Sequence, residues 1–150
     1  MRAGDLMGQL PTVTSSAPVL DAARLLAVHN LPGVIVIDAE QRPAAILPGT
    51  RVLRMAVPGY CQDDPALARV IDERAADLFL GEMAGRTVAC SLAERGADRE
   101  LAVVDLEATL LEIAALMART RTPLVAVADE KQNLLGGITL HTLLDRLLPR

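Results

Sequence analysis

Pro32-Gly-Val-Ile-Val-Ile-Asp38 returns 91 positions later as Pro123-Leu-Val-Ala-Val-Ala-Asp129, and this repetition is the strongest indication of the fold. Each is a short apolar run between a proline and an aspartate, which is the pattern of a buried strand that ends in a turn. The correspondence continues without a gap over residues 13–58 and 104–149. A duplicated unit of this size usually cannot bury its apolar face alone. We therefore expect the two copies to pack about a pseudo-two-fold axis, with a cleft between them.

Each copy predicts the order strand, helix, strand, strand, helix, which makes the fold class α+β. Apolar residues at helical spacing indicate the helices, and short apolar runs bounded by turn residues indicate the strands. Thr109 and Glu112 have the spacing of a capping box, in which the threonine hydroxyl accepts the Glu112 amide and the glutamate returns to the cap amide. The predicted elements are Thr12–Thr14, Pro18–Asn30, Val34–Ile37, Ala44–Leu47 and Arg51–Val57 in the first copy, and Ala102–Val104, a helix from Thr109 that Pro123 stops, Leu124–Ala128, Leu134–Ile138 and Leu140–Leu148 in the second.

A bridge of different sequence separates the copies. Asp63-Asp64-Pro65 is a strong helix start, because carboxylates favour the positive end of a helix and proline suits its first turn. A helix is therefore predicted over residues 66–80, with Gly81 at its C-cap. These features divide the chain into a first repeat at residues 1–60, a bridging helix at residues 61–82 and a second repeat at residues 83–150.

The composition narrows the class of protein. A chain of 150 residues is one domain of ordinary size. Its residues are 51% apolar, yet Tyr60 and Phe79 are its two aromatic residues, so the core must be aliphatic. The net charge of −4 and the scarcity of aromatic rings argue against binding of nucleic acid, which needs a basic footprint and often uses stacking platforms.

Other signals point away from a membrane and from catalysis. No apolar run reaches the roughly 18 residues that a membrane span needs, and residues 1–5 lack the apolar stretch of a signal peptide. Cys61 and Cys90 lack metal-type spacing, and two cysteines in an intracellular chain are usually reduced. His29 and His141 are joined to no serine, cysteine or carboxylate pattern of a known catalytic set. The sequence therefore predicts a cytoplasmic protein without membrane insertion that is not an enzyme.

The second copy carries the residues that identify a family. Pro123–Asp129, followed by Leu135-Gly-Gly-Ile-Thr-Leu-His-Thr-Leu-Leu144, resembles a CBS domain, whose third strand runs into Gly-x-x-Thr/Ser-x-x-Asp at the start of the last helix. Residues 13–58 resemble a more diverged copy, so the resemblance covers nearly the whole chain outside the bridge. It implies a tandem CBS-domain pair, or Bateman module, of the small stand-alone bacterial type, with two β-α-β-β-α repeats packed with pseudo-two-fold symmetry.

The resemblance also implies a function and a partner. CBS pairs often bind AMP, ATP or S-adenosylmethionine in clefts between the repeats, and they report the occupancy to an enzyme or transporter. They commonly form homodimers through their helices, and the leucines of the last helix offer an apolar stripe for that contact, although the same stripe suits the internal core. The leading hypothesis is a regulatory ligand sensor. A ligand-free dimerisation or adaptor module is the alternative, and a small hydrolase or transferase is the third class considered.

In the second copy the cleft residues that the resemblance implies are Gly136, Gly137, Thr139, Thr142 and Asp145. The glycines let a ligand approach the backbone, and the Thr139 hydroxyl with the first-turn amides suits a phosphate, although a plain turn and a plain helix cap explain the same residues. Thr142 stands where the family has its ribose-binding aspartate, and a hydroxyl cannot accept from both ribose hydroxyls as a carboxylate does. Asp145, one helical turn further on, either substitutes for that aspartate or is a solvated charge.

The first copy departs further from the family pattern. Pro48 replaces the threonine, and Arg51 stands where the ribose-binding aspartate would be. Arg51 is either a bidentate phosphate ligand or part of a surface salt bridge or charged rim. We expect this cleft to be empty or to bind something other than a ribose diol. Pro32 and Pro123 recur where the family's backbone meets the adenine ring, and formation of the helix-to-strand corner is the alternative reason for them.

Overall fold

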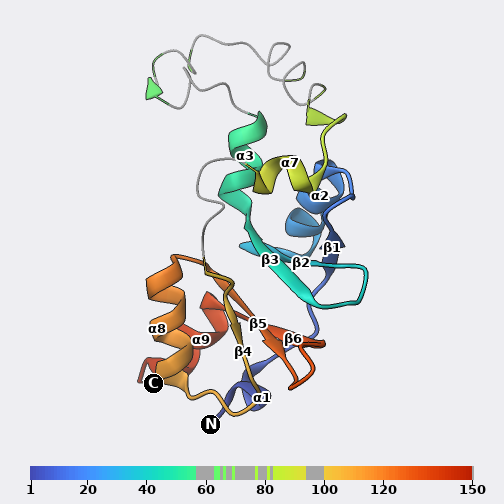
Figure 1. The fold of residues 1–150 in the computed structure, drawn as a ribbon. Coiled ribbons are helices and arrows are strands. Elements are labelled where there is room, and N and C mark those ends of the chain that lie inside the picture. The colour runs from blue at the N-terminus through green and yellow to red at the C-terminus, as the bar shows by residue number, and fades with distance from the viewer. Residues whose placement is uncertain are drawn as a thin grey trace.

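The structure is a computed structural model that describes residues 1–56, 63, 64, 66, 69, 77, 81, 83–93 and 100–149. The predicted bridging helix at residues 61–82 lies for the most part outside the described residues. Each half of the described chain contains the same order of elements, and Figure 1 shows the two halves stacked with their sheets toward each other. The elements are α1 (Ala3–Leu6), β1 (Thr12–Thr14), α2 (Val19–His29), β2 (Gly33–Ile37), β3 (Pro43–Pro48) and α3 (Gly49–Ala56), then α7 (Val88–Leu92), β4 (Val103–Val104), α8 (Leu110–Thr120), β5 (Leu124–Ala128), β6 (Leu134–Thr139) and α9 (Leu140–Leu147).

Two three-stranded sheets with identical topology form the framework. Their orders are β1-β2-β3 and β4-β5-β6, and in each sheet the first pair of strands is parallel and the second pair antiparallel. The predicted α+β class and the duplicated β-α-β-β-α order are therefore confirmed. The Thr109 hydroxyl accepts from the Glu112 amide at 3.2 Å, as the predicted capping box of α8 requires. The second bond differs from the prediction, because Glu112 Oε1 accepts from the Thr109 hydroxyl at 3.4 Å, whereas the predicted partner was the Thr109 amide.

The central strands are apolar throughout because both of their faces are covered. Side chains alternate between the two faces of a strand. On β2, Val34 and Val36 pack with the helices of their own repeat, whereas Ile35 points to the other sheet. On β5, Val125 packs in the core of its own repeat, and Leu124 meets Ile35 across the boundary between the sheets. Both interface side chains are fully buried, and each contributes about 1.5–3 kcal/mol by leaving water.

The short helices α1 and α7 are exchanged between the repeats. Helix α1 begins the chain but packs on the second repeat, where Ala3 is buried and its amide donates to the Ala108 carbonyl at 2.9 Å. Helix α7 follows the bridge but packs on the first repeat, where the amide of buried Val88 donates to the Ala17 carbonyl at 2.9 Å. Each repeat therefore completes its core with a segment from the other half of the chain. The boundaries at residues 60 and 83 are the predicted limits of the two sequence repeats. That they are also domain boundaries stays a proposal.

Residues 7–10 carry the N-terminal segment across β6. Gly8 and Gly137 form an antiparallel pair in which each amide donates to the carbonyl of the other residue at 3.0 Å. A Cβ at Gly136 would lie 2.8 Å from the Gly8 carbonyl oxygen, and a Cβ at Gly137 would lie 2.7 Å from Leu10 Cδ1. The two glycines of the second repeat thus allow the chain's own N-terminal segment to approach the strand closely.

The aspartates that end the two apolar runs build matching turns. Asp129 Oδ1 accepts the amides of Lys131 and Asn133, both at 2.9 Å. Asp38 makes the same pair of bonds in the first repeat, at 2.8 and 3.0 Å. The backbone bonds hold the pKa of the Asp129 carboxyl below its usual value, the bond from Asn133 contributing most.

One backbone bond near these turns joins the repeats on one side only. The Leu134 amide donates to the Gln41 carbonyl at 3.3 Å. The pseudo-symmetric bond would need an amide hydrogen on Pro43, and proline has none. The contact between the repeats is therefore asymmetric, although their backbones follow the same path.

The low pKa of Asp129 makes the stability of the protein depend on pH. Because the carboxyl pKa is lower in the folded protein than in the unfolded chain, the stabilisation is present above the unfolded value of about 4 and is lost as the pH falls through the folded value. We expect the melting temperature to fall more steeply on acidification in the wild type than in Asp129→Asn, which keeps an acceptor oxygen but does not titrate. Melting curves from about pH 6 to pH 2.5 test this, and identical pH slopes in both proteins would contradict it.

The contact between Gly8 and β6 is tested by a matched pair of substitutions. Gly136→Ala forces a Cβ against a backbone oxygen, so we expect a loss of about 1–3 kcal/mol in the free energy of unfolding, the usual cost of overpacking. Gly8→Ala is the control, because a Cβ at Gly8 meets no atom within 4 Å. Urea denaturation measures both variants. If the two variants lose the same stability, residues 7–10 do not lie on β6 as described.

Candidate functional site

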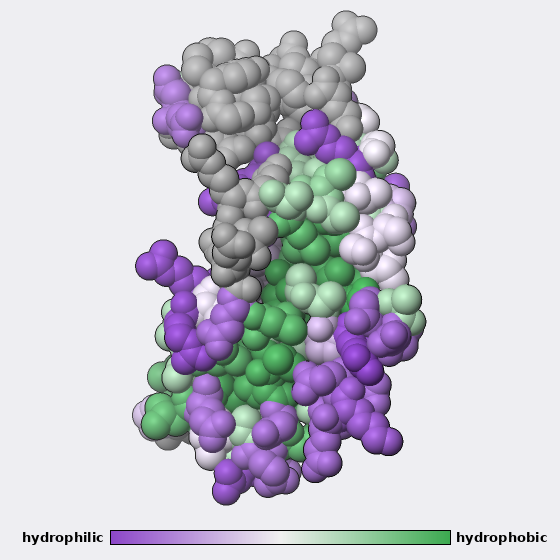
Figure 2. Space-filling model, in the orientation of Figure 1, coloured by the Kyte–Doolittle hydropathy of each residue, from purple (hydrophilic) through white to green (hydrophobic). Residues whose placement is uncertain are grey.

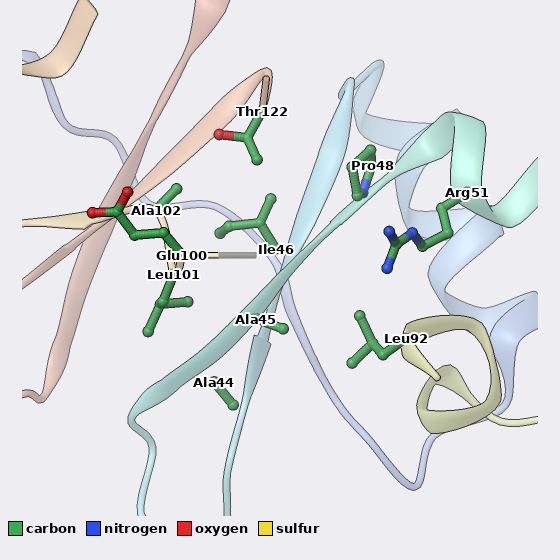
Figure 3. Close-up of a pocket in the computed structure, with 10 residues that line it drawn as sticks. All are labelled: Ala44, Ala45, Ile46, Pro48, Arg51, Leu92, Glu100, Leu101, Ala102 and Thr122. Carbon is green, nitrogen blue, oxygen red and sulfur yellow. The ribbon is translucent and has the colours of Figure 1, made fainter. Parts of the chain in front are cut away.

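A cavity of about 120 Å³ lies in the cleft between the repeats (Figure 3). Strand β3 and the start of α3 form one wall, and the residues that precede β4 and follow α8 form the other. The lining residues are Ala44, Ala45, Ile46, Pro48 and Arg51 of the first repeat, Leu92 of α7, and Glu100, Leu101, Ala102 and Thr122 of the second repeat. On the face shown in Figure 2, a green apolar band runs from one half to the other and crosses the boundary between them. A molecule in this cavity would touch both repeats.

Arg51 supplies the positive charge of this cavity. It lies in the first turn of α3 and is only 8% exposed, although arginine is rarely buried. Figure 3 shows its guanidinium directed toward the space that Pro48 and Leu92 border. A planar guanidinium in a partly desolvated place is well suited to grip a carboxylate or phosphate with two parallel hydrogen bonds.

Glu100 supplies the negative charge of the opposite wall, but Arg119 of α8 holds it. Arg119 Nε donates to Glu100 Oε2 at 2.9 Å, and Nη2 donates to Oε1 at 3.0 Å. This fork lowers the pKa of the Glu100 carboxyl and raises that of the Arg119 guanidinium. In Figure 3 the carboxylate points away from Arg51. Both side chains are more than half exposed, so the pair adds little to stability and serves mainly to orient the carboxylate.

A second cavity of about 480 Å³ adjoins the first, since Pro48 and Arg51 line both. Its walls bring three arginines together, two from α3 and one from the end of α8. Its volume falls within the range of about 300–1,000 Å³ that is typical of small-molecule sites, whereas the first cavity alone is too small. The lining residues are Leu31, Pro32, Pro48, Gly49, Thr50, Arg51, Arg54, Arg121 and Pro123. We call the two cavities together the inter-repeat cleft.

Three of the residues singled out in the sequence meet in this cleft. Pro32 of the first repeat and Pro123 of the second line the same cavity, which Arg51 also lines. The prolines also mark the predicted corners. The carbonyl of Pro32 accepts the Gly49 amide at 2.9 Å, and the Pro123 carbonyl makes the matching bond to α9 at 2.8 Å. Their role toward a ligand stays a prediction.

The other five residues lie outside both cavities of the cleft. Gly136 and Gly137 face the N-terminal segment, as described above. Thr139 is the N-cap of α9, because its hydroxyl accepts the Thr142 amide at 3.2 Å and lies 3.0 Å from the Thr142 hydroxyl. Asp145 is exposed one turn further along α9. These contacts match the alternative in which the threonine is a helix cap, and a ligand at these residues stays a prediction.

Sequence reasoning missed Arg121, Arg54 and Glu100. Arg121 aligns with Asn30 in the first repeat, and nothing in a linear pattern shows that it lies beside Arg51. The spacing of Arg51 and Arg54 on one helix face was the available signal. The third arginine comes from the other repeat, and only the packing of the halves brings it there.

Two other kinds of site find no support in the part of the chain that the structure describes. Within those residues no group of three or more histidine, cysteine, aspartate or glutamate side chains could hold a metal ion. None of the described helices has both the length and the apolar character that crossing a bilayer requires.

Comparison with known proteins adds the family. The family model of the CBS domain matches the chain twice, at residues 3–57 and 97–149. A CBS domain-containing protein of unknown function from Kribbella flavida DSM 17836 has a solved structure that is 43% identical, with 99% of each chain covered and a TM-score of 0.79. None of the curated proteins matches the chain significantly.

More distant structures share the fold. CBSX2, a CBS-pair protein from Arabidopsis thaliana, has been solved in complex with AMP, and it is 21% identical over 97% of this chain and 94% of its own, with a TM-score of 0.66. Hypoxic Response Protein I, solved with two coordinated zinc ions, is 18% identical over 99% of this chain and all of its own, also with a TM-score of 0.66. At these identities the likeness is one of fold.

Proposed function

Because the chain belongs to the CBS-domain family and contains a tandem pair of that domain, we propose that it is a non-catalytic regulatory module that binds a small anionic ligand between its repeats. One observation carries this proposal. The inter-repeat cleft is built from both repeats and has the nearly buried Arg51 at the place where its two cavities join. The remaining walls are mostly apolar, so the charge has a defined position.

Such a cleft provides a physical means of regulation. A ligand that touches both repeats binds more tightly to the arrangement in which the walls are correctly spaced, and it shifts the population by that difference in affinity. The exchanged helices α1 and α7 connect each repeat to the opposite half of the chain. A change in the spacing of the sheets would therefore reach the surfaces on which a partner enzyme or transporter could dock.

An adenine nucleotide is the ligand that we propose to test first. Most residues that line the narrow cavity between Ala45 and Ala102 are apolar, which suits a flat ring, and the adjoining basic cavity suits a phosphate. A structure of CBSX2 holds AMP, which supports the same ligand class for this fold. ATP and S-adenosylmethionine share the ring and belong in the same screen.

The adaptor alternative keeps one specific observation in its favour. In the second repeat the position that corresponds to Ala45 is Gly136, and the Gly8 backbone lies against it. The chain's own segment thus occupies the space beside Gly136. A protein in which the chain itself takes this place could work by dimerisation alone.

The ligand proposal is tested by filling the narrow cavity. We expect millimolar AMP or ATP to raise the melting temperature of the wild type by several degrees, because a ligand at about 100 times its Kd adds about 2.7 kcal/mol to the stability. Ala45→Leu should remove this shift by occupying the apolar wall. Ala89→Leu, an equal change at an exposed position of α7 outside the cleft, should keep it. If no adenine compound shifts the melting curve of the wild type, the adenine proposal is wrong and the adaptor alternative gains.

We also propose that the protein forms a homodimer through α8 and α9. Leu140, Leu144 and Leu147 of α9 are 41–43% exposed and border an apolar groove with Met117 of α8. The groove lies on the helices of the second repeat, and the internal core leaves its leucines partly uncovered.

Sedimentation velocity tests the dimer. We expect the wild type to sediment as a dimer and Leu144→Glu to sediment as a monomer, because a charge in an apolar contact is costly to bury. Leu111→Glu is the control, since Leu111 is 76% exposed on α8 and does not border the groove. A wild type that is monomeric at high concentration rules out this contact.

A further inference from the structure

We propose that a groove beside β4 binds an extended segment of a partner protein, which joins the second sheet as an added parallel strand. The groove has a volume of about 450 Å³ and lies between β4 and one face of α8. Its walls include residues 103–105 on one side and Glu112, Ala115 and Arg119 on the other, and we call it the β4 groove. Apart from Glu100 it shares no described lining residue with the inter-repeat cleft, so this inference goes beyond the proposed function and does not depend on it.

The β4 groove runs along a free edge of the second sheet. The order of strands is β4-β5-β6, so β5 is the one described strand that pairs with β4 (Figure 1). Val103 packs toward the other sheet and Val104 toward the helices of its own repeat, yet both line the groove. A groove bordered by both faces of a strand lies at the edge of that strand. Such an edge is a template for pairing with another chain.

The register of β4 shows which backbone groups point into the groove. Val103 lies opposite Ala126 in a parallel pair, and the Ala126 amide donates to the Ala102 carbonyl at 2.9 Å. Since the backbone groups of alternate residues point to opposite sides of a strand, Ala102 and Val104 face β5. The Val103 carbonyl and the Asp105 amide face outward, and within the described part of the chain neither group has a hydrogen-bond partner.

These two groups suit a parallel strand. One residue of such a strand donates its amide to the carbonyl before Val104 and accepts at its own carbonyl from the amide after Val104. An antiparallel partner would need the amide and the carbonyl of a single residue, and the Val103 amide already donates to the Leu101 carbonyl at 3.0 Å. Two copies of this chain related by a two-fold axis would place their β4 edges antiparallel. The groove is therefore suited to a segment of a different protein.

The β4 groove is negative at one end. Asp105 and Glu112 line the end where β4 finishes and α8 begins, and neither carboxylate forms an ion pair with another described residue. Arg119 lies two turns further along α8, at the other end, where its fork with Glu100 leaves no net charge. A basic side chain of the partner would therefore be attracted to the end at Asp105.

The first repeat shows what the second repeat lacks at this wall. Asp21 of α2 corresponds to Glu112, and Arg24 lies 3.7 Å from Asp21. In the second repeat Ala115 stands in the place of Arg24. The carboxylate of Glu112 thus has no internal cation beside it, and the small alanine leaves room there. A lysine or arginine of the partner would take the role that Arg24 has in the first repeat.

The same geometry predicts which residues the partner carries. The partner residue opposite Val104 points to the same side of the sheet as Val104, where Ala108 and Leu116 form an apolar wall. The residue two positions later points the same way and lies level with the acidic end, because the strands are parallel. The partner segment should therefore carry an apolar residue followed two positions later by a lysine or arginine. Backbone bonds then give affinity, and these two side chains give specificity.

Fluorescence anisotropy with labelled peptides tests the inference. We expect the peptide Ser-Thr-Val-Thr-Lys-Thr-Ser to bind the wild type at millimolar concentration, and to bind more weakly at high salt. Methylation of its valine amide should abolish binding, because this amide donates to the Val103 carbonyl. Methylation of the threonine amide that follows should leave binding intact, because that amide points away from β4. The control peptide Ser-Thr-Lys-Thr-Val-Thr-Ser has the same composition, and it should bind about threefold more weakly because its lysine would lie near Arg119.

Two substitutions on α8 test the walls of the groove. Ala115→Arg should prevent binding, because it supplies beside Glu112 the cation that Asp21 already has in the first repeat. Glu112→Gln should weaken binding about threefold, the usual effect of one exposed ion pair. Asp21→Asn is the matched control, since it removes the corresponding carboxylate from the first repeat, and it should not change binding. All three positions are exposed on helices, so each variant should melt close to the wild type.

Several results would overturn the inference. One is the absence of binding between the wild type and the peptide in which valine precedes lysine. Equal binding of the two peptide orders would exclude the parallel orientation, and equal effects of the two methylations would exclude an added strand. Equal losses in Glu112→Gln and Asp21→Asn would show attraction by net charge alone. The cleft variant Ala45→Leu should bind the peptide as the wild type does, so a failure of the ligand proposal leaves this test intact.

Discussion

The burial of a few aliphatic side chains between two small sheets holds this structure together. Ile35 of β2 and Leu124 of β5 meet at the centre of the boundary, and Ala126 leaves room for the close approach of the strands. A three-stranded sheet with two helices on one face would expose its other face to water. Each sheet in this protein covers the open face of its twin, so neither repeat is complete without the other. This contact brings the ends of helices and strands from both repeats close together, and the inter-repeat cleft lies between them.

The exchange of α1 and α7 strengthens the same contact. Each short helix fills the core of the repeat to which it does not belong in sequence, so separating the repeats would also expose Ala3 and Val88. The segment that leads from α1 to β1 also runs over β6, where the Gly8 backbone lies against Gly136 and Gly137.

Similar backbones thus produce two different surfaces. In the first repeat Ala45, Pro48 and Arg51 border an open, basic cleft. In the second repeat Gly136 and Thr139 stand in the places of Ala45 and Pro48, and they support a close backbone contact and a helix cap. A gene duplication that keeps the core residues leaves such surface positions free to diverge. The pseudo-symmetry describes the fold, and the chemistry is asymmetric.

The repeat, the order of elements, the buried strands and the aspartate turns could all be predicted from the sequence. These features depend on contacts between residues close in the chain or on the alternation of side chains, and both are visible in a linear pattern. The sequence also placed Arg51, Pro32 and Pro123 among the candidate residues. The exchange of α1 and α7, the contact of Gly8 with Gly136 and the place of Arg121 in the same cavity as Arg51 are visible only in the folded chain. Such contacts join residues that are far apart in the chain. They are set by the packing of one apolar face on another, and this packing leaves no periodic pattern in the sequence.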